Sequence, residues 1–305
     1  MTSKKASWIG AMRLRTLPLA ASCVLVGSAL GWHHSTDPWL IFSLTLLTTL
    51  LLQILSNLAN DYGDYAHGVD NADRVGPQRA MQSGAITKRE MKRALLITTV
   101  LTFISGVLLL WISFAAAGLF TTALLFLLVG IGAIIAAFKY TVGKNPYGYR
   151  GLGDLFVFVF FGIVGVCGTA FLHTKLWDTT TLFPAITIGA LSCAVLNLNN
   201  LRDHVNDAAS GKITIVVRMG FERAKGYHLL LLTVAFVALG IWFYISNFEV
   251  WQMLCALPTF ILIVIHGRKV IRTTDAASLD PELKKVALGT FLLSLLFFVV
   301  TLAGN

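Results

Sequence analysis

The stretch LIFSLTLLTTLLLQIL (residues 40–55) runs directly into SNLANDYGDYAHGVD (residues 56–70). The first part is as apolar as the interior of a bilayer, whereas the second carries three aspartates. A similar junction occurs much later in the chain, where NNLRDHVND (residues 199–207) follows another apolar run. The sequence therefore places carboxylates at the ends of two membrane-like segments.

Composition indicates a polytopic membrane protein. The chain has 305 residues, of which 56% are hydrophobic and only 13% are charged, whereas about a quarter of a soluble protein is charged. Apolar stretches of spanning length recur throughout. They predict a single all-α integral-membrane domain over residues 1–305, with nine transmembrane helices near 15–33, 39–60, 91–112, 118–138, 153–173, 181–200, 227–245, 250–267 and 286–303.

The basic residues predict the orientation of these helices. If the N-terminus lies inside, all of the 24 Lys and Arg residues except Lys175 fall in inside segments. Short loops rich in Lys and Arg stay cytoplasmic, so the pattern predicts an N-in, C-out protein of the inner (cytoplasmic) membrane, with both aspartate clusters facing the cytoplasm. The net charge of +9 is explained by these flanking residues, and no nucleic-acid partner is expected.

Both clusters form polar stripes if the preceding helices continue through them. Side chains spaced three, four and seven residues apart share one helix face. The first stripe comprises Asn57, Asn60, Asp61 and Asp64. The second comprises Asn200, Asp203 and Asp207, with Asn199 beside it.

Such stripes need a compensating partner, because Asn and Asp are poor helix formers and like charges repel. Carboxylate and amide oxygens suit Mg²⁺, which keeps several positions for water and substrate phosphates. Two facing stripes could therefore hold Mg²⁺ ions against a diphosphate. Basic residues of the same loops could bind that diphosphate: Arg79, Lys144, Arg202, Lys212 and Arg218.

Two points stay open on the residues alone. Asp70 and Asp73 lie in a glycine-containing stretch and are either turn residues or further metal ligands. A cation transporter would also use membrane carboxylates, although transporter sites typically lie near the bilayer midplane.

Four stretches resemble the UbiA-type intramembrane prenyltransferase superfamily: RLRTLPLA (13–20), residues 57–79, YGYRGLGDLFVFVFFG (147–162) and residues 197–220. The resemblance implies nine helices around a central cavity and Mg²⁺-dependent transfer of a polyprenyl chain from a polyprenyl diphosphate to an aromatic acceptor. Where the superfamily commonly has a third Asp, this chain has Gly68, followed by Asp70. That variant resembles the menaquinone branch, whose acceptor is 1,4-dihydroxy-2-naphthoate; 4-hydroxybenzoate is the alternative.

The resemblance also implies roles for single residues. Asn60 and Asp64 match one metal pair, and Asp203 and Asp207 the other. Tyr140 matches a tyrosine that faces the reacting centre. The implied catalytic residues are Asp61, Asp64, Tyr140, Asp203 and Asp207, and the implied substrate-binding residues are Asn57, Asn60, Arg79, Lys144, Arg150, Asn200, Arg202 and Lys212.

The implied reaction releases diphosphate and CO₂ and gives demethylmenaquinol. The polyprenyl tail is expected in a groove that opens to membrane lipid. Aromatic side chains could line that groove or only pack against neighbouring helices: Phe156, Phe158, Phe160 and Phe161.

Overall fold

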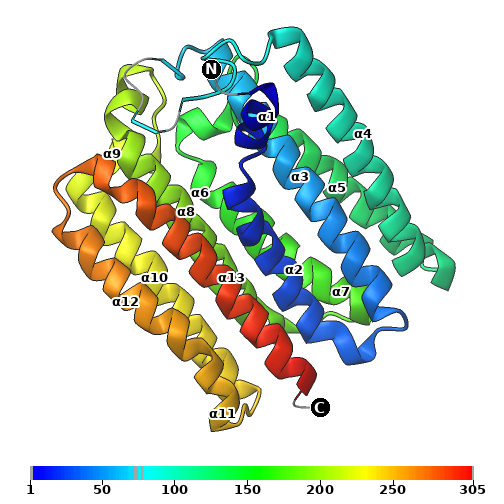
Figure 1. Ribbon diagram of the computed structural model, residues 1–305. Coiled ribbons are helices and arrows are strands. Elements are labelled where there is room, and N and C mark those ends of the chain that lie inside the picture. Colours follow the sequence, from blue (N-terminus) through cyan, green and yellow to red (C-terminus); the bar gives the residue numbers. More distant parts are fainter. Residues whose placement is uncertain (1–2, 72–74, 77, 304–305) are drawn as a thin grey trace.

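The computed structural model describes residues 3–71, 75–76 and 78–303, and every regular element in them is helical (Figure 1). The α-helices are α1 (Lys4–Met12), α2 (Leu17–Gly31), α3 (Pro38–Ala66), α4 (Lys88–Ser113), α5 (Phe120–Lys139), α6 (Gly153–Val157), α7 (Thr169–Thr174), α8 (Leu182–Ala209), α9 (Ile215–Met219), α10 (Phe221–Ile245), α11 (Val250–Met253), α12 (Leu257–Arg272) and α13 (Asp280–Ala303). Between α6 and α7 lies a π-helix, η5 (Phe158–Gly168). Short 3₁₀ turns join several of these elements.

Nine helical segments of the described chain are long and apolar enough to cross a membrane, which confirms the predicted helices. They span Lys4–His34, Pro38–Ala66, Lys88–Ala117, Phe120–Lys139, Gly153–Thr174, Thr179–Ala209, Phe221–Ile245, Val250–Arg272 and Ala276–Ala303. The second and sixth segments extend well past their predicted ends at 60 and 200. Both aspartate clusters are therefore helical.

The two clusters lie at the same end of the bundle. The C-terminal ends of α3 and α8 lie at the end of the bundle where α1 lies, and the C-terminal end of α13 lies at the opposite end (Figure 1). The arrangement is compatible with the N-in, C-out prediction, although which end faces the cytoplasm stays a prediction.

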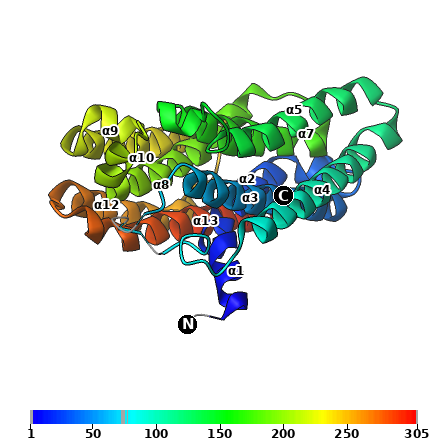
Figure 2. The same cartoon turned by 90° about the horizontal axis from the view of Figure 1, so that it is seen from above.

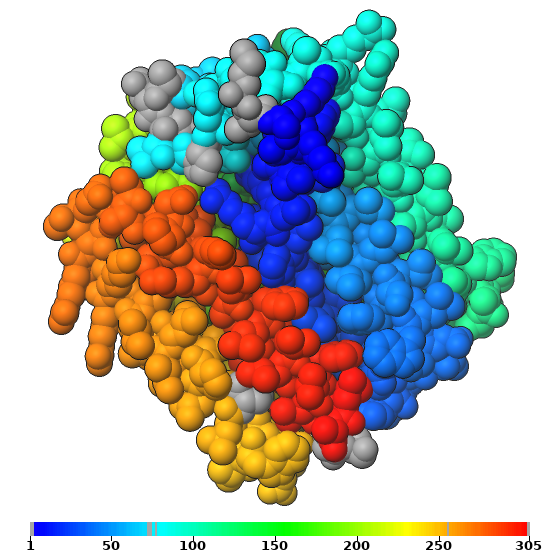
Figure 3. Space-filling view, viewed as in Figure 1, coloured from blue at the N-terminus to red at the C-terminus, as the bar shows by residue number. Residues whose placement is uncertain are grey.

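The bundle is built around α8 and the segment that contains α2. In the most apolar 18-residue stretch of each segment, 78% of the residues are buried inside the protein for α8 and 67% for the segment that contains α2. The corresponding share is 17% for α3 and for α5. α8 packs on α10, η5 and α13, and α13 packs on α2. In Figures 2 and 3 α13 lies beside α2, and α4 lies at the periphery. The outer helices leave large apolar side chains exposed, such as Leu96, Leu128 and Val237, as expected where lipid is the solvent.

Glycines allow the central helices to approach closely. A Cβ on Gly162 of η5 would lie 2.6 Å from the carbonyl oxygen of Ala185 in α8. A Cβ on Gly189 of α8 would lie 2.9 Å from the ring of Phe158. Real Cβ atoms do not tolerate such distances, so these two glycines set the spacing between η5 and α8 and fix one wall of the central cavity.

Candidate functional site

A cavity of about 400 Å³ lies between the helices, and it is polar at one end and apolar along the rest. The polar end is formed by the C-terminal turns of α3 and α8. The apolar part runs along α4, α5 and η5, where Leu109, Phe126 and Val164 line it. This shape suits a ligand with a charged head and a long apolar tail.

The first stripe divides between the cavity and the protein interior. Asn57, Asn60 and Asp64 line the cavity. Asp61 is fully buried and lies outside the lining; its Oδ1 accepts a hydrogen bond from Arg13 and lies 3.6 Å from Nε of Arg79. The structure thus places Asp61, predicted as catalytic, where it holds two arginines.

Local contacts fix the lining residues of α3. The side-chain amide of Asn57 donates to the carbonyl of Met12 (2.9 Å) and to Oγ1 of Thr16 (3.1 Å), which ties α3 to the N-terminal segment. Tyr149 donates a hydrogen bond of 2.7 Å to Oδ1 of Asp64. Burial raises the pKa of the Tyr149 phenol, and the carboxylate of Asp64 adds to that rise, so the phenol stays protonated and able to donate.

The second stripe is held by a buried arginine. Asp203, Asp207 and Asn199 line the cavity. Arg202 is fully buried and donates to both oxygens of Asp203, at 2.8 Å from Nε and 2.6 Å from Nη2. Asn200 is buried but is not among the lining residues. Arg202, predicted to bind substrate, therefore contacts the carboxylate next to it.

Lys212 bridges the two stripes. Its ammonium lies 4.0 Å from Oδ2 of Asp64 and 3.6 Å from Oδ1 of Asp207. Burial alone would lower the pKa of Lys212, but the carboxylates of Asp64 and Asp207 raise it above its ordinary value. A permanent cation therefore lies at the polar end, as the prediction of a diphosphate-binding Lys212 requires.

Tyr140 lines the cavity just beyond the end of α5. Its backbone carbonyl accepts a hydrogen bond from Gly148, and its ring lies against Gly148 and Gly153, where a Cβ would come within 3.1–3.3 Å of ring atoms or the hydroxyl. Burial raises the pKa of Tyr140 to about 12. The phenol is therefore neutral at physiological pH.

The other predicted basic residues separate into two groups. Arg79 lines the cavity and also contacts Asp61 and, at 4.0 Å, Asp70. Lys144 and Arg150 are exposed and are not among the lining residues. Arg218 donates to the backbone carbonyl of Arg150. Of the predicted diphosphate partners, the structure thus places only Arg79 and Lys212 at the cavity.

Of the two aspartates left open by the sequence, Asp70 and Asp73, the structure describes only Asp70. Asp70 is buried, and its backbone follows the end of α3 through a hydrogen bond from Val69 to the carbonyl of Asp64. Asn206 of α8 donates to the carbonyl of Val69 at 3.0 Å, which ties this loop to the second stripe. Asp73 lies outside the described residues.

The carboxylates at the polar end fit a divalent cation for which the protein supplies only some of the ligands. Oδ2 of Asp207 is buried and accepts no hydrogen bond from any described residue, which is costly unless a cation or donor supplies a partner. No three described Asp, Glu, His or Cys side chains form a complete metal cluster. Mg²⁺ usually takes one or two carboxylates and leaves the remaining positions to water and phosphate, and this arrangement of carboxylates allows that.

The apolar part is lined by three of the four predicted phenylalanines: Phe156, Phe160 and Phe161. Phe158 instead packs against Gly189 of α8. The predicted tail groove is therefore compatible with three of these side chains, while the fourth has a packing role.

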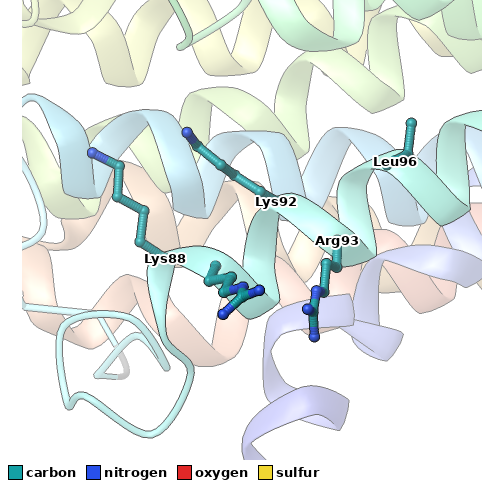
Figure 4. Close-up of a pocket in the computed structure, with 5 residues that line it drawn as sticks. Lys88, Lys92, Arg93 and Leu96 are labelled. Carbon is teal, nitrogen blue, oxygen red and sulfur yellow. The ribbon is translucent and has the colours of Figure 1, made fainter.

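A second hollow of about 500 Å³ opens at the start of α4. It is lined by Lys88, Arg89, Lys92, Arg93 and Leu96, and Figure 4 shows Lys88 and Lys92 directed to one side of the helix and Arg93 to the other. It has no carboxylate in its lining and is built from one helix alone. It is therefore separate from the site on α3 and α8.

Sequence reasoning missed several lining residues, including Arg13, Arg15, Gln53 and Lys284. Arg13 and Arg15 belong to the quoted stretch RLRTLPLA, so that motif held a usable signal. Arg13 has a left-handed backbone (φ 50°) at the end of α1, and it is this turn that brings its side chain to Asp61. Nothing near Gln53 or Lys284 in the sequence distinguishes them from other helical residues.

Comparison with known proteins gives a consistent result. The model of the UbiA prenyltransferase family matches residues 20–296. The chain is 44% identical to 1,4-dihydroxy-2-naphthoate octaprenyltransferase of Escherichia coli (strain K12), covering 97% of this chain and 94% of that protein. It is 40% identical to the protein of the same name from Haemophilus influenzae, covering 100% and 98%.

Solved structures share the fold at much lower identity. A UbiA homolog from Archaeoglobus fulgidus, bound to GPP and Mg²⁺, aligns with a TM-score of 0.62 and 16% identity over 97% of this chain and 98% of that chain. A digeranylgeranylglyceryl phosphate synthase aligns with a TM-score of 0.64 and 15% identity over 98% and 99%.

Proposed function

The chain belongs to the UbiA prenyltransferase family, and we propose that it transfers a polyprenyl chain from polyprenyl diphosphate to 1,4-dihydroxy-2-naphthoate. Its close relatives are named as enzymes of this activity. The observation that carries the proposal is the cavity between the helices, which is polar where the two aspartate stripes meet and apolar over the rest of its length. In the reaction the allylic C–O bond breaks and its electrons leave with diphosphate, a C–C bond from the prenyl group to the aromatic ring forms, and the C–C bond between the ring and its carboxylate breaks to release CO₂.

We propose that Asn60, Asp64, Asp203 and Asp207 hold Mg²⁺. Mg²⁺ ions held by these two pairs would neutralise the diphosphate and make it a better leaving group. The support from this chain is the buried, unbonded Oδ2 of Asp207 and the position of Asp64 at the same end of the cavity.

Residues of the chain supply the rest of the polar site. Lys212 and Arg79 are two permanent cations at the polar end of the cavity, where they could bind the oxygens of the diphosphate. The neutral phenol of Tyr140 can donate a hydrogen bond without adding charge near the reacting carbon. Asp61, which does not line the cavity, keeps Arg13 and Arg79 in place.

The apolar part of the cavity protects the reaction and holds the tail. Phe156, Phe160 and Val164 line it, and an apolar lining that keeps water out would prevent hydrolysis of a reactive allylic group. The names of the relatives make octaprenyl diphosphate the first donor to test. The protein would act in the inner membrane with this site on the cytoplasmic side.

Product analysis of the purified protein tests this function. Octaprenyl diphosphate, Mg²⁺, 1,4-dihydroxy-2-naphthoate and 4-hydroxybenzoate are mixed at equal acceptor concentration, and prenylated products are identified by mass spectrometry. The second ring of the naphthoate buries roughly 60–80 Å² more, which at about 25 cal/mol per Å² gives a ten- to thirtyfold preference. A predominantly prenylated benzoate would assign the other acceptor, and the absence of any prenylated product would contradict the proposal.

A further inference from the structure

Arg202 donates to four oxygen atoms of three side chains on two helices. Besides both oxygens of Asp203, its Nη2 donates to Oδ1 of Asn199 at 2.8 Å. Its Nη1 donates to Oδ1 of Asp280, the first residue of α13. Every nitrogen of this buried guanidinium is therefore engaged, and one of its partners, Asp280, belongs to neither aspartate cluster.

The two carboxylates that Arg202 contacts differ in exposure. A single guanidinium lies between two carboxylates, Asp203 on the cavity side and Asp280 on the other. The side chain of Asp280 is 38% exposed and lies 3.8 Å from Nη1 of Arg15, whereas that of Asp203 is 6% exposed. Because the guanidinium is shared, Asp280 reduces the positive charge that Asp203 experiences.

We propose that Asp280 is a positioning residue that sets the affinity of the carboxylate site for its divalent cation, by sharing Arg202 with Asp203. The inference rests on the proposed function, since it takes Asp203 as part of the cation site. Without the carboxylate of Asp280, Arg202 would neutralise Asp203 more completely and would lose the contact that holds it away from the cavity. A cation would then bind more weakly.

The alternative is that the Arg202–Asp280 ion pair only anchors α13 to α8. Both roles would lower the unfolding temperature when Asp280 is changed. Only the proposed role would change the Mg²⁺ concentration that the site requires. The two quantities are separated by measuring the unfolding temperature of the purified protein, with inorganic diphosphate present, across a series of Mg²⁺ concentrations, because bound ligand stabilises the folded state by mass action.

Asp280→Asn should shift half-maximal stabilisation to about threefold to tenfold higher Mg²⁺, as expected for a half-buried charge one ion pair away from the cation. Asp280→Glu keeps the charge and should stay within about twofold of the wild type. Asp275→Asn is the matched control. Asp275 caps the preceding 3₁₀ turn by accepting from Ala277, and within the described part of the chain it forms no ion pair with an arginine. It should leave the Mg²⁺ midpoint unchanged.

A double-mutant cycle tests the route through Arg202. Arg202→Lys keeps one charge but loses the planar fork that reaches both carboxylates. In that background Asp280→Asn should shift the Mg²⁺ midpoint by less than about twofold, since coupled residues are non-additive. An equal shift in both backgrounds would show that Asp280 acts through bulk charge and would overturn the proposal.

The remaining outcomes are also informative. An unchanged Mg²⁺ midpoint in Asp280→Asn, with the wild type showing normal Mg²⁺-dependent stabilisation, would refute the role of Asp280 alone. A wild type that Mg²⁺ does not stabilise would instead count against the cation site of the proposed function.

Discussion

The C-terminal turns of α3 and α8 look alike in sequence, but they neutralise their charge in opposite ways. In α3 the arginines contact Asp61, which does not line the cavity, and the cavity carboxylate Asp64 accepts from the neutral Tyr149 and lies 4.0 Å from Lys212. In α8 the buried Arg202 binds Asp203, which lines the cavity itself. The difference shows that equal spacing of aspartates does not mean equal availability to a cation. Asp64 and Asp207 share one cation, Lys212, at 4.0 and 3.6 Å, whereas Arg202 contacts Asp203 directly.

The largest effect should come from that pair. Asp64→Asn and Asp207→Asn keep the size of the side chain and remove the charge that holds the cation, so turnover should fall on the order of a thousandfold. Turnover is measured by product formation from radiolabelled polyprenyl diphosphate in detergent. Asp37→Asn, at the start of α3 and the opposite end of the bundle, is the control and should remain active. Near-normal turnover in both test variants would refute the two-stripe site.

Asp61→Asn should act on stability before it acts on chemistry. The substitution leaves Arg13 and Arg79 without their buried counter-charge, which typically costs about 3–5 kcal/mol. The measurement is the denaturant midpoint in detergent, compared with Asp64→Asn. If Asp61 is instead a catalytic group, its variant would unfold like the wild type and lose turnover as Asp64→Asn does.

Tyr149→Phe should have a moderate effect that is confined to the first stripe. It removes one hydrogen bond to a charged group, worth about 1.5–3 kcal/mol, and leaves Asp64 free to rotate. We expect turnover to fall by about tenfold or somewhat more. Tyr244→Phe, which is exposed on α10, is the control. A Tyr149→Phe enzyme with unchanged turnover would show that Lys212 alone orients Asp64.

The smallest perturbation tests whether the two stripes share one side of the membrane. In a cysteine-free background, Ser83→Cys and Ser210→Cys follow the first and second cluster, and Ser246→Cys lies at the far end of α10. None of them should alter turnover by more than about twofold, as for most surface changes. A membrane-impermeant thiol reagent should reach positions 83 and 210 only from the cytoplasmic side and position 246 only from the other. Labelling of positions 83 and 210 from opposite sides would show that the two stripes do not share one side of the membrane.

Much of the architecture followed from the sequence, because lipid imposes a strong constraint. A segment must be long and apolar to cross a bilayer, and its backbone must be hydrogen-bonded within itself. Hydropathy therefore gave all nine spanning segments. It missed the polar extensions of several helices: the starts of the first and ninth segments, at Lys4 and Ala276, and the C-terminal ends of α3 and α8, which carry the carboxylates.

The sequence by itself determined that this is an all-helical membrane protein with two carboxylate stripes at one end of the bundle, because length, apolarity and helical spacing are local properties of the chain. Tertiary structure alone decided which carboxylates face the cavity and which cations neutralise them. Arg13 reaches Asp61 across 48 residues, and Arg202 reaches Asp280 across 78. Electrostatic partners are chosen by distance in space and by burial, and neither is encoded in the spacing of a single helix.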